Sequence, residues 1–286
     1  MVATALAEDL GEEWSVDDDA TGRATVPRDT VATATVVPRQ AGVLAGMDAL
    51  VETYRQVDPD VSVDLLAADG DRAVPGQPVA RLVGPARSVM AGERTALNLL
   101  THLSGVATAT RRYVDAVAGT GCAVRDTRKT LPGLRLLQKQ AVAAGGGANH
   151  RMSLVDGVLV KDNHVAAAGG IRQAVRAALE GSGDLEVQVE VDTLEELDVV
   201  LAEGVVNVLL DNFSPAGAGE GVARCRAAGE RTGTVVFVEA SGRITLDSAR
   251  EMAETGVDAI AVGGLTHSAV ALDLGLDIRL HPHEEA

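Results

Sequence analysis

The sequence predicts an α/β protein with two units, an N-terminal α/β unit and a C-terminal unit built on a parallel sheet. Two observations support this division. Residues 1 to about 118 hold short strand-like segments and then one long helical pattern, whereas residues 119–269 alternate strand-like and helix-like segments at intervals of about 20 to 35 residues. A chain of 286 residues with 46% hydrophobic residues can bury a full core in each unit.

The N-terminal unit begins with short strand candidates. Residues 30–46 alternate in polarity, and the segments 61–67 and 78–84 are further strand candidates on either side of a turn at 75–78. A long helical pattern starts at Ala86, and we expect it to break near Gly105 because glycine is a weak helix former. Since no lysine precedes Lys129, this unit cannot be a lipoyl or biotinyl carrier domain.

The C-terminal unit contains six apolar runs, each separated from the next by a helical pattern. The runs are 122–129, 157–164, 185–192, 206–213, 234–242 and 258–267. Repeated strand–helix units predict right-handed crossovers and a parallel sheet. Six units are two short of a closed eight-fold barrel, so the sequence predicts an incomplete α/β barrel.

The six runs end in a similar way, with a charged or glycine element. These ends are Arg128-Lys129, Lys161, Glu190, Asp211, Glu239 and Gly263-Gly264. Parallel strands buried on both faces are apolar, so a charge at the end of such a run marks the open edge of the sheet. That edge carries the active site in α/β barrels. The sequence therefore predicts an active site built from several strand ends.

Positive charge is concentrated at these ends although the chain has a net charge of -16. All three lysines, Lys129, Lys139 and Lys161, lie within 33 residues. The cationic group formed by Arg128, Lys129, Arg151 and Lys161 favours a receptor for a substrate with several anionic groups, and the clustering of the lysines supports this. The alternative is that these cations form solvated ion pairs that only neutralise an acidic surface.

Glu190 and Asp211 are expected to follow consecutive strands. Such carboxylates can anchor Mg²⁺ directly or through water or substrate, or stabilise a developing oxocarbenium ion. Alternatively, they pair with Lys161 or Arg128 to neutralise the site. Glu239 has no assigned partner and could equally orient its own loop.

Two glycine-rich segments, 239–243 and 262–268, follow the last two strand candidates. Backbone amides in such loops bind phosphate, and barrels often place a phosphate site there. The alternative is two ordinary turns in which glycine only supplies a positive φ. His150, His164 and His267 lie near the predicted site, but their spacing does not predict a metal centre. His102 is expected to pack on its helix, and His281 and His283 to lie in a polar tail.

The composition limits partners and location. The negative net charge disfavours nucleic-acid binding, and no apolar run reaches the roughly 18 residues of a membrane span. The N-terminus lacks a secretory signal, and Cys122 and Cys225 form no metal or disulfide pattern. We therefore expect a cytoplasmic protein without nucleic-acid or membrane partners.

The assembled motifs resemble the quinolinate phosphoribosyltransferases, also called carboxylating nicotinate-nucleotide pyrophosphorylases. The resemblance runs nearly end to end, through residues 5–11, 41–46, 93–100, 126–135, 145–151, 161–164, 209–215, 238–244 and 262–269. It departs from the family pattern at Ser153, where glycine is usual, and at Gly264, where alanine is expected. It implies an N-terminal α/β sandwich (1–118), to which a strand at 270–280 returns, and a TIM-like, type II phosphoribosyltransferase barrel (119–269).

The resemblance also implies the reaction. Members transfer the phosphoribosyl group of phosphoribosyl pyrophosphate to quinolinate, with Mg²⁺, and release CO₂ to give nicotinate mononucleotide for NAD synthesis. Arg94 is implied to enter the site of a neighbouring subunit, which makes the enzyme at least a homodimer. The implied quinolinate contacts are Arg94, Thr127, Arg128, His150, Arg151 and Lys161. The implied phosphoribosyl pyrophosphate contacts are Lys129, Glu190, Asp211, Ser241, Gly242, Arg243, Gly263, Gly264 and His267.

Of these residues, Lys129, Lys161, Glu190 and Asp211 are the implied catalytic groups, with Glu190 and Asp211 serving Mg²⁺. Two other functions remain open from the residues. One is a Schiff-base lyase with Lys161 as nucleophile, and the other is a related phosphoribosyltransferase-like enzyme with a different substrate.

The excess of Asp and Glu, with arginine used almost everywhere in place of lysine, favours a high-salt cytoplasm. We therefore expect the purified protein to lose stability below molar salt, because repulsion between its carboxylates is then unscreened. Thermal denaturation over a series of salt concentrations measures this. A melting temperature that does not depend on salt would contradict the hypothesis.

Overall fold

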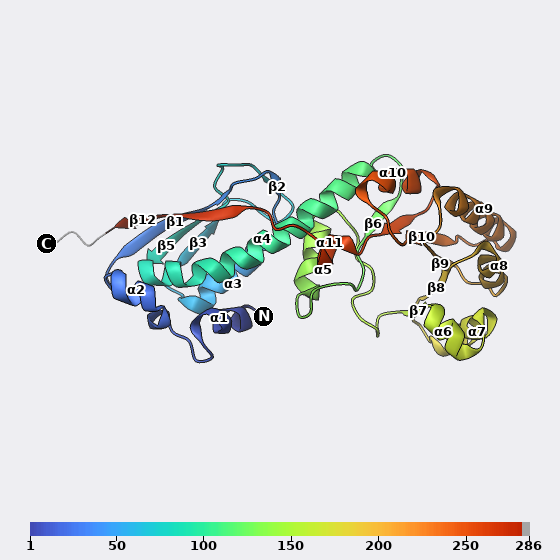
Figure 1. The fold of residues 1–286 in the computed structure, drawn as a ribbon, viewed down its shortest axis with the longest axis horizontal. Coiled ribbons are helices and arrows are strands. Elements are labelled where there is room, and N and C mark those ends of the chain that lie inside the picture. The colour runs from blue at the N-terminus through green and yellow to red at the C-terminus, as the bar shows by residue number, and fades with distance from the viewer. Residues whose placement is uncertain (282–286) are drawn as a thin grey trace. The chain divides into compact units, whose positions relative to one another are not determined.

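The computed structural model describes residues 1–281, which form two compact units (Figure 1). The first unit combines Met1–Arg111, Leu131–Gly146 and the segment from Ser268 onward, and the second combines Arg112–Thr130 with Gly147–His267. These boundaries differ from the expected division at residue 118, because residues 131–146 join the first unit. Each unit has its own sheet.

The first unit is built on a four-stranded antiparallel sheet with the order β12-β1-β5-β3. The strands are β1 (Val31–Pro38), β3 (Ser62–Leu65), β5 (Ala80–Pro85) and β12 (Leu274–His281), and β2 (Gly42–Val43) pairs separately with β4 (Arg72–Ala73). The C-terminal strand β12 thus lies beside β1 over its whole length. Alternate residues of β1 are buried, which is why the sequence alternates in polarity there.

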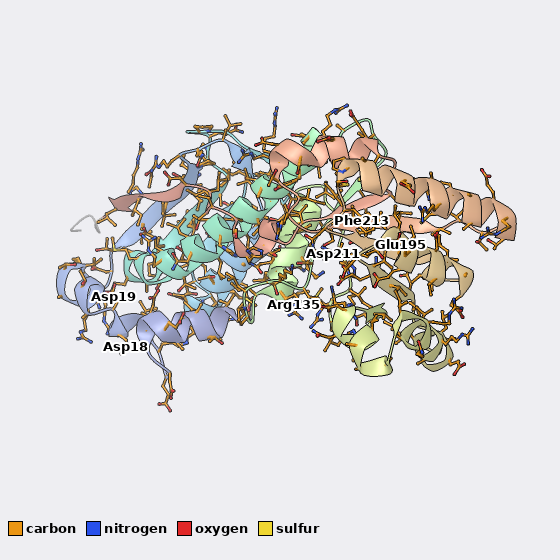
Figure 2. All side chains as sticks on the ribbon, turned by 45° about the vertical axis from the view of Figure 1, so that its right-hand side comes forward. Asp18, Asp19, Arg135, Glu195, Asp211 and Phe213 are labelled. Carbon is orange, nitrogen blue, oxygen red and sulfur yellow. The ribbon has the colours of Figure 1, made fainter. Side chains whose placement is uncertain are left out.

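The helices α3 (Met47–Val57) and α4 (Ala86–Ala116) pack with the sheet of the first unit and share one hydrophobic core with it. Leu50 and Tyr54 of α3 and Leu97 and Leu100 of α4 are buried in this core. The smaller helices are α1 (Val2–Leu10), the 3₁₀ helix η1 (Val16–Asp18) and α2 (Ala20–Thr25). Asp19 caps α2, since its side chain accepts a hydrogen bond from the Thr21 backbone N–H (Figure 2).

Helix α4 (Ala86–Ala116) runs through Gly105 without a break, so the expected interruption there is wrong. Gly105 serves packing instead. A Cβ atom at this position would overlap the carbonyl oxygen of Val270, and the Leu272 N–H donates to the Thr101 carbonyl at 2.9 Å beside it. The absent side chain therefore lets the returning C-terminal segment lie directly against the helix.

Helix α5 (Arg135–Ala144) follows the first strand of the parallel sheet but packs in the first unit. Its residues Gln138 and Lys139 are buried, and Gln138 Nε2 lies 2.9 Å from His102 Nε2 on α4. Gly145 at its C-terminal end has no room for a Cβ beside the Ala107 carbonyl. These contacts explain why residues 131–146 leave the barrel unit.

The second unit confirms the predicted parallel sheet of six strands, in the order β6-β11-β10-β9-β8-β7. The strands are β6 (Ala123–Arg125), β7 (Val158–Val160), β8 (Val187–Val191), β9 (Asn207–Asp211), β10 (Phe237–Ser241) and β11 (Ala259–Ala261). Strands β6 and β7 are the two edges of this sheet, so the barrel is open between them.

Helices connect the parallel strands and lie along the outside of the sheet (Figure 1). They are α6 (Asp162–Ala168), α7 (Ile171–Gly181), α8 (Leu194–Ala202), α9 (Pro215–Thr232) and α10 (Leu246–Glu254), and the short α11 (Gly264–His267) follows the last parallel strand, β11. The side chains of Thr193, Ser214 and Thr245 cap α8, α9 and α10 by accepting backbone N–H groups. The helix starts are therefore set by local sequence.

The close approach at Gly105 predicts a large effect of one methyl group. We expect Gly105→Ala to lower the free energy of unfolding by about 1 to 3 kcal/mol, because the new Cβ would displace the Val270 segment. Gly181→Ala is the matched control, since nothing lies within 4 Å of a Cβ at that helical position. The control should keep its stability or gain up to about 1 kcal/mol. Denaturant unfolding of both variants measures the difference, and equal stabilities would contradict the packing role.

Candidate active site

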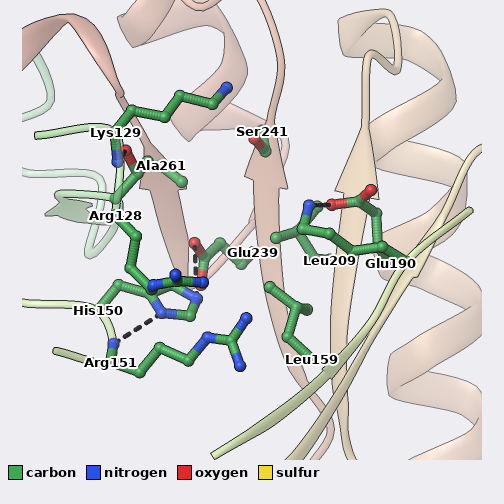
Figure 3. Close-up of a pocket in the computed structure, with 12 residues that line it drawn as sticks. Arg128, Lys129, His150, Arg151, Leu159, Glu190, Leu209, Glu239, Ser241 and Ala261 are labelled. Carbon is green, nitrogen blue, oxygen red and sulfur yellow. Dashed lines mark hydrogen bonds and ion pairs between the residues drawn. The ribbon is translucent and has the colours of Figure 1, made fainter. Parts of the chain in front are cut away.

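A cavity of about 290 Å³ opens at the carboxyl end of the parallel sheet in the second unit (Figure 3). Residues of all six strands, or of the loops beside them, surround it. They are Thr127, Arg128, Lys129, His150, Arg151, Leu159, Lys161, Glu190, Leu209, Glu239, Ser241 and Ala261. The structure thus brings together residues that the sequence analysis placed at separate strand ends.

The strand register determines which side chains share this cavity. Leu209 of β9 is paired with Glu190 on one side and with Glu239 on the other, so these three residues form one row across the sheet. Asp211 and Ser241 are paired two positions further along the same strands. Because side chains alternate along a strand, both rows face the same side of the sheet.

Arg128 and Arg151 lie together on one wall of the cavity (Figure 3). Burial and the nearby charge of Arg128 lower the pKa of Arg151, and Arg151 Nη1 donates to the Gly157 carbonyl at 2.7 Å. The Nε atom of Arg128 is buried and has no hydrogen-bond partner within the described chain. Two crowded guanidinium groups, one with an unused donor, favour binding of an anion with more than one carboxylate.

Lys161 and Glu190 form an ion pair on the opposite side of the cavity, between the end of β7 and β8 (Figure 3). Burial raises the pKa of the Glu190 carboxyl; Lys161 opposes this shift and the Asp211 carboxylate adds to it. Asp211 lies at the end of β9, where its side chain accepts a hydrogen bond from Asn212 Nδ2 at 2.6 Å (Figure 2). The sequence analysis gave, as an alternative role, that Glu190 pairs with Lys161 only to neutralise charge. The structure contains this ion pair, but the pair lies inside the cavity.

The sequence analysis placed Glu239 at the end of its strand and left open that it orients its own loop, and the structure contradicts both. It lies in the middle of β10, fully buried, because the strand continues to Ser241. Its Oε2 atom accepts hydrogen bonds from Arg125 Nη1 at 2.6 Å and from Gln188 Nε2 at 3.1 Å. Glu239 therefore contacts residues of two other strands rather than its own loop.

The segment that carries His150 is fixed by a buried carboxylate. Asp126 is fully buried and accepts hydrogen bonds from the His150 backbone N–H at 2.9 Å and from Asn149 Nδ2 at 2.6 Å. Sequence reasoning missed Asp126, Arg125 and Gln188. Their signal was present, since all three are polar residues inside or directly after apolar strands, where an unpaired polar group is unfavourable.

The glycine loops lie at the ends of β10 and β11. Gly242 has a φ of +93°, and a Cβ there would overlap the side chain of Asn212, so only glycine fits. Arg243 also adopts a positive φ of 51° and is exposed. A Cβ at Gly263 would lie 3.1 Å from Lys129 Cδ and 3.4 Å from His267 Nε2, so both side chains pass close to this backbone. Gly264 begins α11.

Lys129 itself is exposed, but its backbone is held in place. Its N–H donates to Thr127 Oγ1 at 3.0 Å, and its carbonyl accepts from Thr266 Oγ1 at 2.8 Å. The lysine side chain can therefore extend from a fixed loop across the glycine segment that precedes α11.

Several sequence candidates lie outside this cavity. Lys139 is buried on α5 in the first unit, so the lysine cluster in the sequence does not mark three site lysines. Arg94 is an exposed residue of α4 in the first unit. His164 Nδ1 accepts the Lys161 N–H at 3.0 Å at the start of α6, and burial lowers the pKa of the packed His102. His283 lies outside the described residues.

No group of three or more His, Cys, Asp or Glu side chains within residues 1–281 is arranged to hold a metal ion. In the same residues, no helix combines the length and the apolar character of a membrane span.

The open parallel barrel and its charged cavity define an α/β-barrel enzyme that acts on anionic substrates. Family models agree with this and divide the chain at a similar place. The model of the N-terminal domain of quinolinate phosphoribosyl transferase matches residues 19–104, and that of the C-terminal domain matches residues 106–277. The chain belongs to the quinolinate phosphoribosyl transferase family.

Individual relatives are named nicotinate-nucleotide pyrophosphorylases. The carboxylating nicotinate-nucleotide pyrophosphorylase of Mycobacterium leprae is 47% identical over 274 residues, which cover 94% of each chain. A probable carboxylating nicotinate-nucleotide pyrophosphorylase of Bacillus subtilis is 40% identical over 86% of this chain and 83% of the relative. The solved nicotinate-nucleotide pyrophosphorylase of Francisella tularensis superposes with a TM-score of 0.87 at 36% identity, covering 97% of this chain and 94% of that structure.

The raised pKa of Glu190 predicts how replacing its carboxyl group changes the free energy of unfolding at different pH values. Because its pKa is higher in the folded chain, the proton it binds stabilises the fold at low pH, and that stabilisation is lost as the pH rises through the folded pKa. Glu190→Gln is therefore expected to be at least as stable as the parent at about pH 8, with any advantage shrinking toward about pH 4.

Glu203→Gln is the matched control with the opposite sign. Hydrogen bonds and ion pairs with Arg176 and Arg172 lower the pKa of Glu203, so its stabilisation is present at neutral pH and lost as the pH falls. This variant should be less stable than the parent at about pH 8 and equal to it at low pH. Urea unfolding at both pH values gives the comparison. A stability loss at high pH in Glu190→Gln, matching that of the control, would overturn the assignment.

Proposed function

We propose that this protein is a pentosyltransferase that transfers the phosphoribosyl group of phosphoribosyl pyrophosphate to quinolinate. The product loses its 2-carboxylate as CO₂ and becomes nicotinate mononucleotide, a precursor of NAD. The observation that carries the proposal is the cavity in which the crowded pair Arg128 and Arg151 faces the ion pair of Lys161 and Glu190. Membership of the family and the names of the relatives support the same reaction.

Quinolinate is a flat ring with two adjacent carboxylates, and the cavity offers complementary groups. Arg128 and Arg151 supply guanidinium donors for the carboxylates, with His150 and Thr127 beside them. Leu159 and Leu209 supply apolar surface for the ring. Two mutually repelling arginines gain more from a dianion than from a monoanion, which favours quinolinate over a pyridine with one carboxylate.

The ribosyl phosphate is proposed to lie toward the glycine loops. Lys129 and His267 lie close to Gly263, and backbone amides of the segments at 241–243 and 263–264 are available for the 5′-phosphate. Lys129 supplies a point charge for phosphate oxygens. Ser241 is proposed to lie between the ribosyl phosphate and the pyridine ring. It lines the cavity and directly precedes the glycine loop at Gly242.

In the transfer step, the pyridine nitrogen forms a bond to the anomeric carbon while the bond from that carbon to the pyrophosphate oxygen breaks. Positive charge develops on the ribose ring, and the carboxylates of Glu190 and Asp211 stabilise it electrostatically. Burial makes this stabilisation stronger than it would be in water. Lys161 pairs with Glu190 and opposes the rise in its pKa that burial causes, which favours the ionised carboxylate.

In the second step, the bond between the ring carbon and the 2-carboxylate breaks and CO₂ leaves. The electron pair stays on the ring carbon next to the cationic nitrogen and then takes up a proton. Arg128, Arg151 and Lys161 hold the carboxylates in the ground state, so the rate gain must come from positive charge that stabilises the electron pair at the ring carbon.

The carboxylates of Glu190 and Asp211 also fit a magnesium ion, because they are hard oxygen donors close enough for the charge of one to raise the pKa of the other. Since the described chain provides no larger ligand group, most ligands would come from the substrate and water. When bound, Mg²⁺ would neutralise the pyrophosphate leaving group. We also propose a cytoplasmic homodimer, or a multiple of dimers, in which the exposed Arg94 serves the site of a neighbouring subunit.

A Schiff-base mechanism is less well supported, because the Lys161 ammonium group is paired with Glu190 rather than held as a free amine. The second alternative was a phosphoribosyltransferase-like enzyme with a different substrate. It is less well supported, because Arg128, Arg151 and Lys161 line the cavity together and can bind a dicarboxylate.

The test is formation of nicotinate mononucleotide and CO₂ from quinolinate and phosphoribosyl pyrophosphate, with nicotinate as the competing substrate. We expect turnover of quinolinate only, and Lys161→Ala should lower it by at least about a hundredfold while the protein remains folded. Turnover of nicotinate in place of quinolinate would contradict the substrate assignment. A fully active Lys161→Ala variant would contradict the catalytic role of this residue.

A further inference from the structure

A chain of hydrogen bonds connects Arg125 to the cavity wall, and Figure 3 shows its last members, Glu239, His150 and Arg151. Arg125 Nη1 and Gln188 Nε2 both donate to Glu239 Oε2, at 2.6 and 3.1 Å. The other end of the Gln188 amide, Oε1, lies 2.9 Å from His150 Nε2. The backbone N–H of Arg151 donates to His150 Nδ1 at 2.7 Å.

The chemistry of these groups fixes the direction of every bond. A carboxylate oxygen only accepts, so the NH₂ group of Gln188 must face Glu239 and its carbonyl oxygen must face His150. That oxygen also only accepts, so His150 Nε2 must carry a hydrogen. Nδ1 accepts from the Arg151 N–H and must be bare. His150 is therefore a neutral imidazole with its hydrogen on Nε2.

The network is shielded from water, which makes its direction costly to reverse. Glu239 is fully buried, Gln188 is 4% exposed, and the Arg125 guanidinium lies 5.8 Å from the centroid of the Phe237 ring. Glu239 lines the cavity, and its Oε1 atom, which has no hydrogen-bond partner within residues 1–281, lies 4.0 Å from His150 Nε2. A buried carboxylate with one free oxygen at a substrate cavity suggests a role beyond stability.

We propose that Glu239 is a positioning residue for the arginine wall of the cavity. Through Gln188 it holds His150 in the form with hydrogen on Nε2, and bare Nδ1 then holds the backbone of Arg151. Arg125 balances the buried charge of Glu239, so the carboxylate does not repel an anionic substrate. The effect on catalysis rests on the proposed binding of quinolinate at Arg128 and Arg151.

Loss of the carboxylate removes the group that orients Gln188. The amide can then turn its NH₂ group toward His150 Nε2, which moves the ring hydrogen to Nδ1. In that form Nδ1 no longer accepts the Arg151 N–H, so the Arg151 segment loses its anchor. Binding of quinolinate weakens while binding of phosphoribosyl pyrophosphate, at the opposite side of the cavity, does not.

The test uses Glu239→Gln, which keeps the shape but replaces an obligate acceptor with an amide, and Gln188→Met, which cuts the link and leaves Glu239 in place. Glu186→Gln is the matched control, since Glu186 lies two positions from Gln188 and contacts Asn207 Nδ2 instead. Nitrogen-15 spectra of the histidine rings report the position of the hydrogen in the absence of substrate. The His150 signals are identified by their loss in His150→Asn.

We expect hydrogen on Nε2 in the parent and in Glu186→Gln, and a shift toward Nδ1 in Glu239→Gln or loss of a fixed form in Gln188→Met. KM for quinolinate should rise roughly tenfold in both site variants, with KM for phosphoribosyl pyrophosphate unchanged. The double variant should be no worse than the more affected single one, because both changes break the same chain.

Unchanged His150 spectra in both variants, or equal rises of both KM values, would overturn the proposal. If Glu239→Gln does not fold, Gln188→Met alone decides, because it leaves the Arg125–Glu239 pair intact. Arg128→Met separates this proposal from the proposed function. An unchanged KM for quinolinate in that variant refutes the substrate placement, whereas the ring spectra test the network in either case.

Discussion

The hydrogen-bond register of the parallel sheet is the constraint on which the rest of the site depends. Pairing of Leu209 with both Glu190 and Glu239 puts two carboxylates on the cavity side, and pairing of Asp211 with Ser241 adds the next row. A slip of one residue in β9 relative to β8 would turn Asp211 toward the helices. The ion pair of Lys161 and Glu190 depends in the same way on the register of β7 with β8, in which Val160 is paired with Val189.

Within this register, the cavity holds like charges close together, although it also contains the ion pair of Lys161 and Glu190. Arg128 and Arg151 repel each other on one wall, while the carboxylate of Glu190 remains buried beside Asp211 on the other. Neither arrangement favours folding of the free chain, and each becomes favourable when a ligand of opposite charge arrives. On the surface, Arg172 and Arg176 instead pair directly with Glu203, so opposite charges there stabilise the folded chain without a ligand.

Much of the fold and part of the site could be predicted from the sequence. The six parallel strands could be predicted because each buried strand is a short apolar run between helical patterns. The charged residues near the ends of these runs predicted the position of the cavity. The position of α5 and the continuity of α4 through Gly105 were missed, because both depend on contacts with segments remote in the chain. The partners of Glu239 could not be predicted for the same reason. Lys139 is buried in the other unit, so lysines that are close in the sequence need not be close in space.

The pairing of β12 with β1 has a consequence for the order in which the molecule can form. The first sheet contains eight register pairs between residues 31–38 and residues 274–281, so one of its inner strands lacks a neighbour until residues 274–281 have been made. The second sheet, from β6 to β11, is complete in the chain before β12 is made. On the ribosome, the domain that emerges first is therefore the one that is completed last, and β1 remains an open strand edge in the meantime.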